Sequence, residues 1–400
     1  MWPFEDARST VLSHAQPLSS ESVVLEAALG RCLSAPFVAR LDNPAFDNSS
    51  VDGYAVRAAE VSAGVLLPLQ ATVNAGSSAP ELPPGACMAV FTGAPLPVGA
   101  DAVVMQEDAE RGDGEVRFKH ALPAGSNVRL QGEEYRVGDP LLPIGTPVTP
   151  PVVALLAMNG ATSAPVHRSP SVCIVSTGNE LAEPGQARGP NQVYDGNGPG
   201  LMAAARSLGI SDARPSRVVD REDLLRVALK DALSEADVVV TSGGVSVGEK
   251  DLIKGVWAEL GVEQVIWQVA MRPGKPFYFG VGHGKLVFGL PGNPVSALVC
   301  FHLFCRPALL KLMGFGEEAL KPICARLTAE TACQAERTDF IRGRLAADGD
   351  GLSATPLRDQ GSHMLGGLAS ANCLIRIPPG SEAMLSGAQV EAYSINWTPV

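Results

Sequence analysis

Residues 237–246 read Asp-Val-Val-Val-Thr-Ser-Gly-Gly-Val-Ser, and this stretch decides the fold class. Three successive valines are typical of a strand that is covered on both faces, as the strands of a parallel sheet are. The strand runs directly into a Gly-Gly pair, whose bare backbone lets a loop approach a ligand closely. Residues 171–178, Ser-Val-Cys-Ile-Val-Ser-Thr-Gly, repeat this order of apolar strand and glycine loop. Both stretches predict buried parallel strands that end in ligand-binding loops.

Around these two strands, residues 166–315 alternate between strand-like and helix-like segments. A strand followed by a helix, repeated four times, predicts parallel βαβ units and a doubly wound α/β domain. The strands are expected at 171–176, 217–219, 237–241 and 285–289, and the helices at 200–208, 221–235, 251–260 and 294–312.

The segments on both sides of this domain differ from it in kind. Residues 9–35 have helical periodicity up to Gly30 and predict a helix. Residues 36–165 and 318–400 consist of short strand-like runs between glycine and proline turns, which predict β-rich structure. The later region is expected to form a small β-barrel or sandwich. In the earlier region the strands are expected at 66–73, 86–91, 102–106, 115–119 and 140–142.

Composition and charge exclude several classes of function. The chain has 400 residues, of which 46% are hydrophobic, so it can bury the cores of two to four domains. Its net charge of −11 repels phosphate backbones and anionic lipid, which argues against nucleic-acid and membrane partners. The longest uninterrupted apolar runs are far shorter than the roughly 20 residues of a membrane span. We expect a cytoplasmic protein that holds any anionic ligand in a local basic pocket.

Three polar loops follow predicted strands, at residues 176–180, 241–246 and 290–294. In a doubly wound sheet, the carboxyl ends of the strands line one crevice where ligands bind. Each loop offers glycine backbone near the start of a helix, which favours phosphate. A rigid basic turn at 271–276 presents Arg272 and Lys275, which suit a tetrahedral oxyanion.

Two carboxylates near these loops have more than one interpretation. Asp251 follows the Gly-Gly loop, and a carboxylate beside phosphate requires a bridging cation such as Mg²⁺. Asp195 stands two residues before Asn197, ahead of a predicted helix. Each of the two carboxylates could instead cap the helix that follows it. Asn293 before Pro294 is likewise typical of a helix start.

Seven motifs in order carry a resemblance to a known family. The sequence resembles the molybdopterin molybdenumtransferases, the MoeA-type enzymes related to the C-terminal domain of gephyrin. The resemblance extends from about residue 44 to residue 370. The motifs are Asp-Asn-Ser-Ser-Val-Asp-Gly-Tyr-Ala-Val-Arg at 47–57, Phe-Thr-Gly-Ala-Pro at 91–95, Asn-Val-Arg-Leu-Gln-Gly-Glu at 127–133, Ser-Thr-Gly-Asn-Glu-Leu at 176–181, Ser-Gly-Gly-Val-Ser-Val-Gly-Glu-Lys-Asp at 242–251, Pro-Gly-Lys-Pro at 273–276 and Leu-Pro-Gly-Asn-Pro-Val-Ser-Ala at 290–297.

The resemblance implies a reaction, a cofactor and partners. The family inserts molybdate into adenylylated molybdopterin and releases AMP, with the help of Mg²⁺. The resemblance also implies a homodimer whose active site combines the α/β domain of one subunit with the β-rich domain of the other, and a possible contact with the molybdopterin adenylyltransferase. The implied domains are a linking domain (1–45 and 125–165), an inserted β-rich domain (46–124), a molybdopterin-binding α/β domain (166–315) and a C-terminal β-barrel (316–400).

The family's functional residues fall on matching positions of this sequence. Catalytic roles are implied for Asp52, Thr92, Glu180 and Asp251, with Asp251 on the metal. Substrate binding is implied for Arg129, Thr177, Gly178, Asp195, Asn197, Asp220, Gly243, Gly244, Ser246, Pro291, Gly292 and Asn293. Molybdate binding is implied for Arg272, Lys275, Arg342 and Ser362.

The sequence departs from the family pattern at several positions. Gln268 stands where a lysine is common, which removes one positive charge near the expected molybdate site. Arg272 replaces a second lysine, Glu134 replaces an aspartate, and Gly196 replaces a serine between Asp195 and Asn197. Two alternatives stay open, namely a molybdopterin adenylyltransferase and a non-catalytic scaffold module like that of gephyrin.

Overall fold

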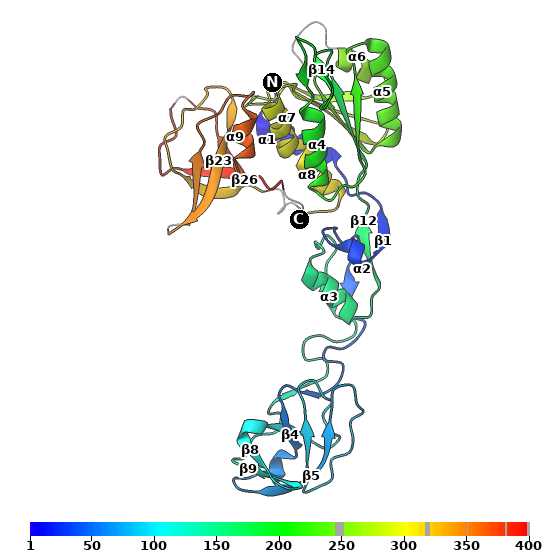
Figure 1. Ribbon diagram of the computed structural model, residues 1–400, viewed down its shortest axis with the longest axis vertical. Helices are drawn as coiled ribbons and strands as arrows, with labels where there is room; N and C mark the ends of the chain where they lie inside the picture. Colours follow the sequence, from blue (N-terminus) through cyan, green and yellow to red (C-terminus); the bar gives the residue numbers. More distant parts are fainter. Residues whose placement is uncertain (245–251, 317–320, 350, 381, 398–400) are drawn as a thin grey trace. The chain divides into compact units, whose positions relative to one another are not determined.

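A computed structural model describes residues 1–244, 252–316, 321–349, 351–380 and 382–397. The chain divides into two compact units (Figure 1). Unit 1 comprises Met1–Ala35, Ile144–Val153 and Thr162–Val400, and unit 2 comprises Pro36–Pro143 and Ala154–Ala161. The finer division into four domains stays a prediction.

The centre of unit 1 is a six-stranded sheet in the order β16-β13-β17-β21-β20-β18. The first four strands are parallel, whereas β20 is antiparallel to both of its neighbours, so the sheet is mixed. The four strands predicted for this domain are the four parallel ones, whereas β20 and β18 were not predicted, and a tight turn at 283–284 joins β20 and β21 without a helix. The strands are β13 (Val172–Thr177), β16 (Ala213–Val218), β17 (Val238–Ser242), β18 (Glu263–Trp267), β20 (Tyr278–Gly282) and β21 (Lys285–Leu290).

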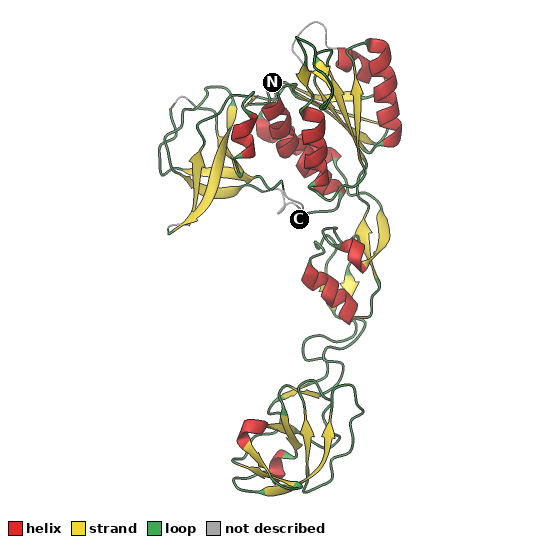
Figure 2. Cartoon of the chain, viewed as in Figure 1, coloured by secondary structure: helices red, strands yellow, loops and turns green. Residues whose placement is uncertain are grey.

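Helices cover both faces of this sheet, which confirms the doubly wound fold (Figure 2). Ile174 and Val240 pack on one face with α4, α7 and α8, whereas Val175 and Val239 pack on the other with α5 and α6. This alternation of neighbouring residues explains why the central strands are apolar throughout. The helices are α4 (Asn197–Arg206), α5 (Glu222–Glu235), α6 (Leu252–Glu259), α7 (Pro294–Cys300) and α8 (Arg306–Leu312).

The helix expected at 294–312 is continuous but not regular. A five-residue π-helical segment, Phe301–Cys305, joins α7 to α8. By length and composition alone, Pro294–Leu312 could cross a membrane, but 83% of it is buried within the protein. Such burial is typical of a core helix.

The C-terminal part of unit 1 is the expected small barrel. Strand pairing follows the order β23-β24-β22-β26-β25, and an additional β23–β25 pairing closes the ring. The strands are β22 (Ile323–Leu327), β23 (Thr338–Asp348), β24 (Gly351–Pro356), β25 (Cys373–Ile377) and β26 (Gln389–Ser394), with helix α9 at Leu365–Ala369. A short strand of the α/β region, β19 (Met271–Arg272), pairs with β23 and so ties the barrel to the basic turn.

The single helix expected over residues 9–35 is wrong. The chain forms α1 (Phe4–His14), strand β1 (Ser20–Val24) and a short α2 (Leu25–Ala28). Pro17 explains the break, because proline disfavours helical backbone at the residue before it. Strand β1 pairs with β12 (Ser163–His167), and α3 (Pro150–Met158) precedes that strand. Phe4 of α1 contacts the rings of Phe304 and Phe340, which links α1, the π-helical segment and the barrel in one core.

Unit 2 is built on a six-stranded sheet in the order β7-β4-β6-β5-β9-β8. The five predicted strands of this region are confirmed to within about two residues. The strands are β4 (Gly53–Val56), β5 (Leu66–Val73), β6 (Cys87–Val90), β7 (Ala102–Met105), β8 (Ala109–Arg111) and β9 (Glu115–Phe118), with the pairs β3 (Asn48–Ser49) with β10 (Val128–Arg129) and β2 (Phe37–Val38) with β11 (Pro140–Leu142). Tyr54, Val104 and Phe118 lie in its core.

Candidate active site

The carboxyl ends of three neighbouring parallel strands bring the predicted loops together. In the strand register, Ser176 of β13 lies opposite Ser242 of β17, which lies opposite Leu290 of β21. Adjacent strands are about 4.8 Å apart, so Thr177, Gly243 and Pro291 emerge at one edge of the sheet. The expected clustering of these loops is confirmed.

Asn197 fixes the spacing between two of these loops. Its side-chain amide donates to the hydroxyl of Ser242 and to the carbonyl oxygen of Gly292, both at 2.8 Å. Asp195 accepts a hydrogen bond from the backbone N–H of Gly198 at 2.9 Å and therefore caps the first turn of α4. The capping hydrogen bond expected for Asp195 is present, Asn197 ties loops together, and substrate binding by either residue stays a prediction. Both contacts hold the loop edge in a fixed geometry.

Gly243 is required by the close approach of the β17 loop to β13. Its φ is +95°, and a Cβ there would lie 2.4 Å from the carbonyl oxygen of Thr177. Gly244, with φ of +67°, would place a Cβ 2.4 Å from the Cδ1 atom of Ile253. A side chain at 243 would push the β17 loop away from β13, whereas one at 244 would meet the flexible end of the Ile253 side chain on α6. These glycines therefore expose backbone at the edge, as phosphate binding requires.

Acidic side chains border the same edge. The Thr177 hydroxyl donates to the Asp220 carboxylate, and the Asp220 backbone N–H donates to the Asn179 side chain at 3.2 Å. The Glu180 carboxylate lies against Gly178, since a Cβ on this glycine would be 2.8 Å from it. Ser246 and Asp251, both predicted site residues, lie outside the described residues.

A pocket of about 810 Å³ opens beside these loops. The Ser176 hydroxyl lies at its wall, is 2% exposed and has no hydrogen-bond partner in the structure. Arg206 and Arg217 add positive charge to the lining, and Trp397 adds an aromatic face. These three residues were not predicted from sequence. Of the three, Arg217 is the one with a signal in the sequence, because it is a cation near the end of a strand of the sheet.

The basic turn carries an ion pair that the sequence did not reveal. A guanidinium nitrogen of Arg272 lies 2.7 Å from the Asp339 carboxylate of β23, which is its register partner. The Asp339 side chain is 1% exposed, whereas that of Arg272 is 52% exposed. Burial raises the pKa of Asp339, and Arg272 opposes that rise. Asp339 therefore anchors a guanidinium whose other side faces solvent.

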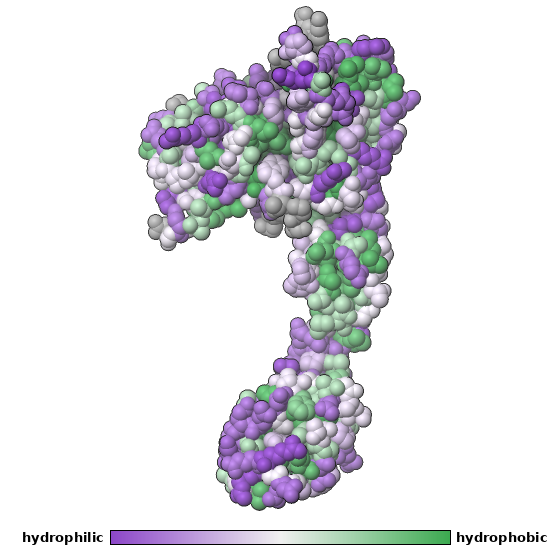
Figure 3. Space-filling view, viewed as in Figure 1, coloured by the Kyte–Doolittle hydropathy of each residue, from purple (hydrophilic) through white to green (hydrophobic). Residues whose placement is uncertain are grey.

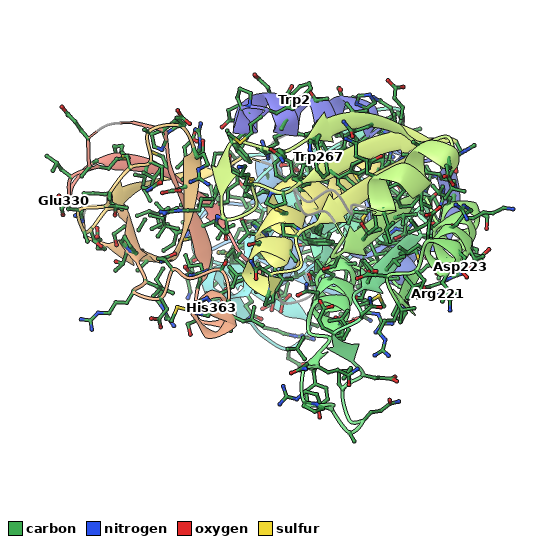
Figure 4. The ribbon with its side chains drawn as sticks, turned by 90° about the horizontal axis from the view of Figure 1, so that it is seen from above. Trp2, Arg221, Asp223, Trp267, Glu330 and His363 are labelled. Carbon is green, nitrogen blue, oxygen red and sulfur yellow. The ribbon has the colours of Figure 1, made fainter. Side chains whose placement is uncertain are left out.

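Backbone contacts from the N-terminus shape the segment before this turn. Gln268 has a φ of +62°, which is uncommon for a residue with a side chain. The Trp2 backbone N–H donates to the Gln268 carbonyl at 3.0 Å, and the Ala270 N–H donates to the Trp2 carbonyl at 2.8 Å. Trp2 and the neighbouring Trp267 are labelled in Figure 4. Gln268, which stands where the family commonly has lysine, therefore has a backbone conformation that is held by hydrogen bonds with the first residues of the chain.

Arg342 and Ser362 lie in and near the barrel. The Arg342 side chain is buried, and burial lowers the pKa of its guanidinium. It donates to the carbonyl oxygens of Asp359 and Gly361, at 3.0 and 3.2 Å. Arg342 therefore organises the loop that leads into Ser362. A molybdate contact by either residue, or by Lys275, stays a prediction.

Unit 2 holds a second group of predicted residues. One carboxylate oxygen of Asp52 accepts two hydrogen bonds from Thr92, from its backbone N–H and its hydroxyl, both at 2.8 Å. These bonds lower the pKa of Asp52. Arg129 lines a pocket of about 550 Å³ with Glu133 and Glu134. Asp52 and Thr92 are therefore in contact, whereas Arg129 lines a pocket whose lining includes neither of them.

The predicted magnesium site can be compared with the oxygen donors present at the loop edge. Among the described residues, no group of three or more His, Cys, Asp or Glu side chains is arranged to hold a metal. Mg²⁺ is commonly held by one or two carboxylates together with substrate phosphates, and Asp220 and Glu180 provide such oxygens at the loop edge. The donor set at this edge thus fits a cation that arrives with a phosphorylated substrate.

Three family descriptions match the chain. "MoeA N-terminal region (domain I and II)" matches residues 2–160, "Probable molybdopterin binding domain" matches 173–311, and "MoeA C-terminal region (domain IV)" matches 324–395. Together they cover most of the sequence, including both units.

Curated relatives and solved structures agree with these matches. The chain is 34% identical over 380 residues to a molybdopterin molybdenumtransferase of Haemophilus influenzae, covering 94% of each chain. It is 34% identical over 405 residues to the Bacillus subtilis protein of the same name, covering 98% of this chain and 94% of that one. A crystal structure of a molybdopterin biosynthesis protein from Pyrococcus horikoshii superposes with a TM-score of 0.83 at 34% identity, over 98% of both chains.

Proposed function

The chain belongs to the MoeA family of molybdopterin molybdenumtransferases, and on this premise we propose that it inserts molybdate into adenylylated molybdopterin with release of AMP. The chain is an enzyme of molybdenum cofactor biosynthesis. One observation carries the proposal: a loop edge with glycine backbone, buried hydroxyls and carboxylates lies in the same unit as a basic turn anchored by a buried carboxylate.

The loop edge supplies the binding of the adenylylated substrate. Gly243 and Gly244 carry no side chains, so phosphate oxygens can come close to the loop backbone, while the Gly243 N–H itself donates to the Leu290 carbonyl oxygen at 3.2 Å. The unpartnered Ser176 hydroxyl offers a hydrogen bond to a polar group inside the 810 Å³ pocket. Arg206 and Arg217 at that pocket neutralise negative charge on the bound molecule. Positioning and charge neutralisation of this kind supply most of the catalysis in phosphoryl chemistry.

The basic turn supplies the binding of molybdate. Arg272 presents a guanidinium in the fork geometry that matches a tetrahedral oxyanion, and Lys275 adds a second cation three residues later. Asp339 restricts the Arg272 side chain, so less conformational freedom is lost when the oxyanion binds. Magnesium, held by Asp251 or by Asp220 and Glu180 of the loop edge, would neutralise charge on the scissile phosphate linkage.

We further propose that the enzyme works as a cytoplasmic homodimer. The proposed catalytic residues Asp52 and Thr92 belong to unit 2, whereas Thr177, Asp220 and Arg272 belong to unit 1. In the proposed homodimer, each active site combines the unit 2 residues of one subunit with the unit 1 residues of the other. The molybdopterin adenylyltransferase, which makes the substrate, is the proposed upstream partner.

The test is AMP release from adenylylated molybdopterin with and without molybdate. The proposal predicts release that depends on molybdate and falls in Asp251→Ala, with binding of the substrate retained. Formation of the adenylate from ATP would favour the adenylyltransferase alternative instead. Absence of both activities in folded protein would favour the scaffold alternative.

A further inference from the structure

A small cationic pocket lies where α1, α8 and the barrel meet in unit 1. It has a volume of about 120 Å³. Three cationic side chains from different elements line it, namely Arg8 of α1, Arg306 of α8 and Lys321 just before β22. None of the residues that line it in the described part of the chain is a carboxylate. In a chain of net charge −11, three cations around one small cavity form a local concentration of positive charge.

The charge of Arg306 is not neutralised by the described residues. No ion pair or hydrogen bond of its guanidinium is found there, and its Nε atom is buried without a partner. Burial lowers the pKa of Arg306, because taking the cation out of water penalises its charged form. Glu5, a carboxylate of α1, is paired with Arg376 at 2.8 Å. Arg306 is half-buried, so a guanidinium without an ion pair at this position is costly, and a bound anion would lower that cost.

His302 provides an independent indication of a ligand. It belongs to the π-helical segment Phe301–Cys305, lines the pocket and is 5% exposed. Its Nδ1 atom is buried and has no hydrogen-bond partner among the residues that the structure describes. Burial, followed by the nearby charge of Arg306, lowers its pKa to about 3, while a hydrogen bond to the Ser394 backbone acts in the opposite direction. The imidazole is therefore neutral at pH 7.

The tautomer of His302 decides which oxyanion fits. A hydrogen bond that raises the pKa of an imidazole is one in which the ring donates, here to the Ser394 backbone. A neutral ring has one N–H, so the unpartnered Nδ1 carries the lone pair and can only accept. An acceptor among cations suits an anion that still carries a proton. Inorganic phosphate has such a proton at neutral pH, whereas sulfate and molybdate do not.

We propose that this pocket is a second anion site, separate from the candidate active site, which binds one inorganic phosphate ion. Arg8, Arg306 and Lys321 surround the charge, and Nδ1 of His302 accepts the phosphate proton. The volume of about 120 Å³ holds one tetrahedral oxyanion but not a nucleotide. The ion would bridge α1, α8 and the barrel, whose contacts with one another include the Phe4 ring cluster.

Calorimetric titration of the full chain with inorganic phosphate, at pH 7 and constant ionic strength, tests this site. Wild-type protein should bind phosphate more tightly than sulfate or molybdate at this pocket. Arg306→Leu should weaken phosphate binding at least tenfold, and His302→Phe should abolish the preference for phosphate over sulfate. Arg226→Leu is the matched control, since Arg226 is an exposed arginine paired with two glutamates on the surface, and it should change neither value.

Two results would overturn the proposal. One is unchanged phosphate affinity in Arg306→Leu, and the other is loss of all phosphate binding in Arg272→Ala, which would place the ion at the basic turn. If Arg306→Leu does not fold, wild-type crystals soaked in arsenate decide, because arsenate is protonated like phosphate and scatters anomalously. A peak bounded by Arg306 and His302 supports the site, and its absence at saturating arsenate rejects it.

Discussion

The loop edge of the α/β sheet and the Asp52–Thr92 pair of unit 2 hold their polar side chains in different environments. At the loop edge the polar groups are buried, with Ser176 and Ser242 2% exposed and Thr177 4% exposed. Thr177 bonds to Asp220 and Ser242 bonds to Asn197, whereas the Ser176 hydroxyl has no partner among the described residues. Asp52 and Thr92 are exposed, and within the described part of the chain their side chains bond only to each other's residue. The geometry of the loop edge is fixed by the strand register of the folded sheet. The geometry of the Asp52–Thr92 pair depends on two hydrogen bonds between exposed groups of unit 2.

This contrast predicts that substitutions at the loop edge affect both stability and activity, whereas those at the pair affect activity alone. The surface in Figure 3 mixes polar and apolar side chains, so exposure of a polar pair does not by itself identify a site. The contrast therefore has to be tested by substitution.

The largest effect is expected from Gly243→Ala. The new Cβ would meet the Thr177 carbonyl oxygen at 2.4 Å, which forces the loops apart. A displacement of about 1 Å at a catalytic site lowers activity roughly 100-fold, and we expect kcat/KM for AMP release to fall by about that factor. The free energy of unfolding should fall by about 2–4 kcal/mol.

Gly30→Ala is the control for this substitution. Gly30 also has a positive φ, of +74°, but a Cβ there would have nothing within 4 Å. It should lose only about 1 kcal/mol of stability and keep its activity. Equal loss of activity in both variants would show that backbone strain, and not the loop contact, explains the effect.

Thr92→Val should give the next largest effect on activity. It removes the hydroxyl donor to Asp52, while the backbone donor remains. Losing one hydrogen bond to a charged group lowers kcat/KM by about tenfold, and the pKa of Asp52 should rise toward its usual value. Rate measurements and an NMR titration of the carboxyl carbon test both statements, and the unfolding midpoint should not move. A drop in that midpoint would contradict the contrast drawn here.

Asp237→Asn should affect stability without affecting activity. Asp237 lies at the start of β17, away from the loop edge, and accepts hydrogen bonds from Arg168 and Ser171. Burial alone would raise its pKa, but these bonds outweigh burial and lower it from 3.8 to about 2. The folded state is therefore stabilised above pH 4 by about 2 kcal/mol. That contribution is lost as the pH falls from about 4 to about 2.

Chemical unfolding at pH 7 and near pH 2 measures this difference. The gap between wild type and Asp237→Asn should be present at pH 7 and small at the lower pH, with AMP release unchanged at neutral pH. Asp223→Asn is the control, because Asp223 forms an exposed pair with Arg221, 2.6 Å apart (Figure 4). It should leave stability nearly unchanged.

The sequence predicts the loop edge well because its determinants are local. The valine run before Gly243 and the apolar run before Gly178 encode buried strands, and parallel pairing then brings their ends together. The strands of unit 2 are encoded equally locally. The prediction of one helix over residues 9–35 is wrong because the apolar periodicity continues past Pro17, which disfavours helical backbone at the residue before it.

The residues that sequence reasoning missed depend on contacts between distant segments. Asp339 lies 67 residues from Arg272 in the chain, and only the β19–β23 register brings them to 2.7 Å. Trp397 reaches the 810 Å³ pocket from beyond the last barrel strand. Nothing in the local sequence of either residue indicates its partner.

The most direct test of the central claim, that both clusters serve one reaction, is complementation between two inactive variants. Asp52→Ala removes the exposed carboxylate of unit 2, and Asp220→Ala removes a carboxylate of the loop edge. Mixed dimers of the two should recover molybdate-dependent AMP release, to about a quarter of the wild-type rate, because half of the dimers are mixed and each has one intact site. Failure to recover any activity, with mixed dimers demonstrably formed, would contradict the account.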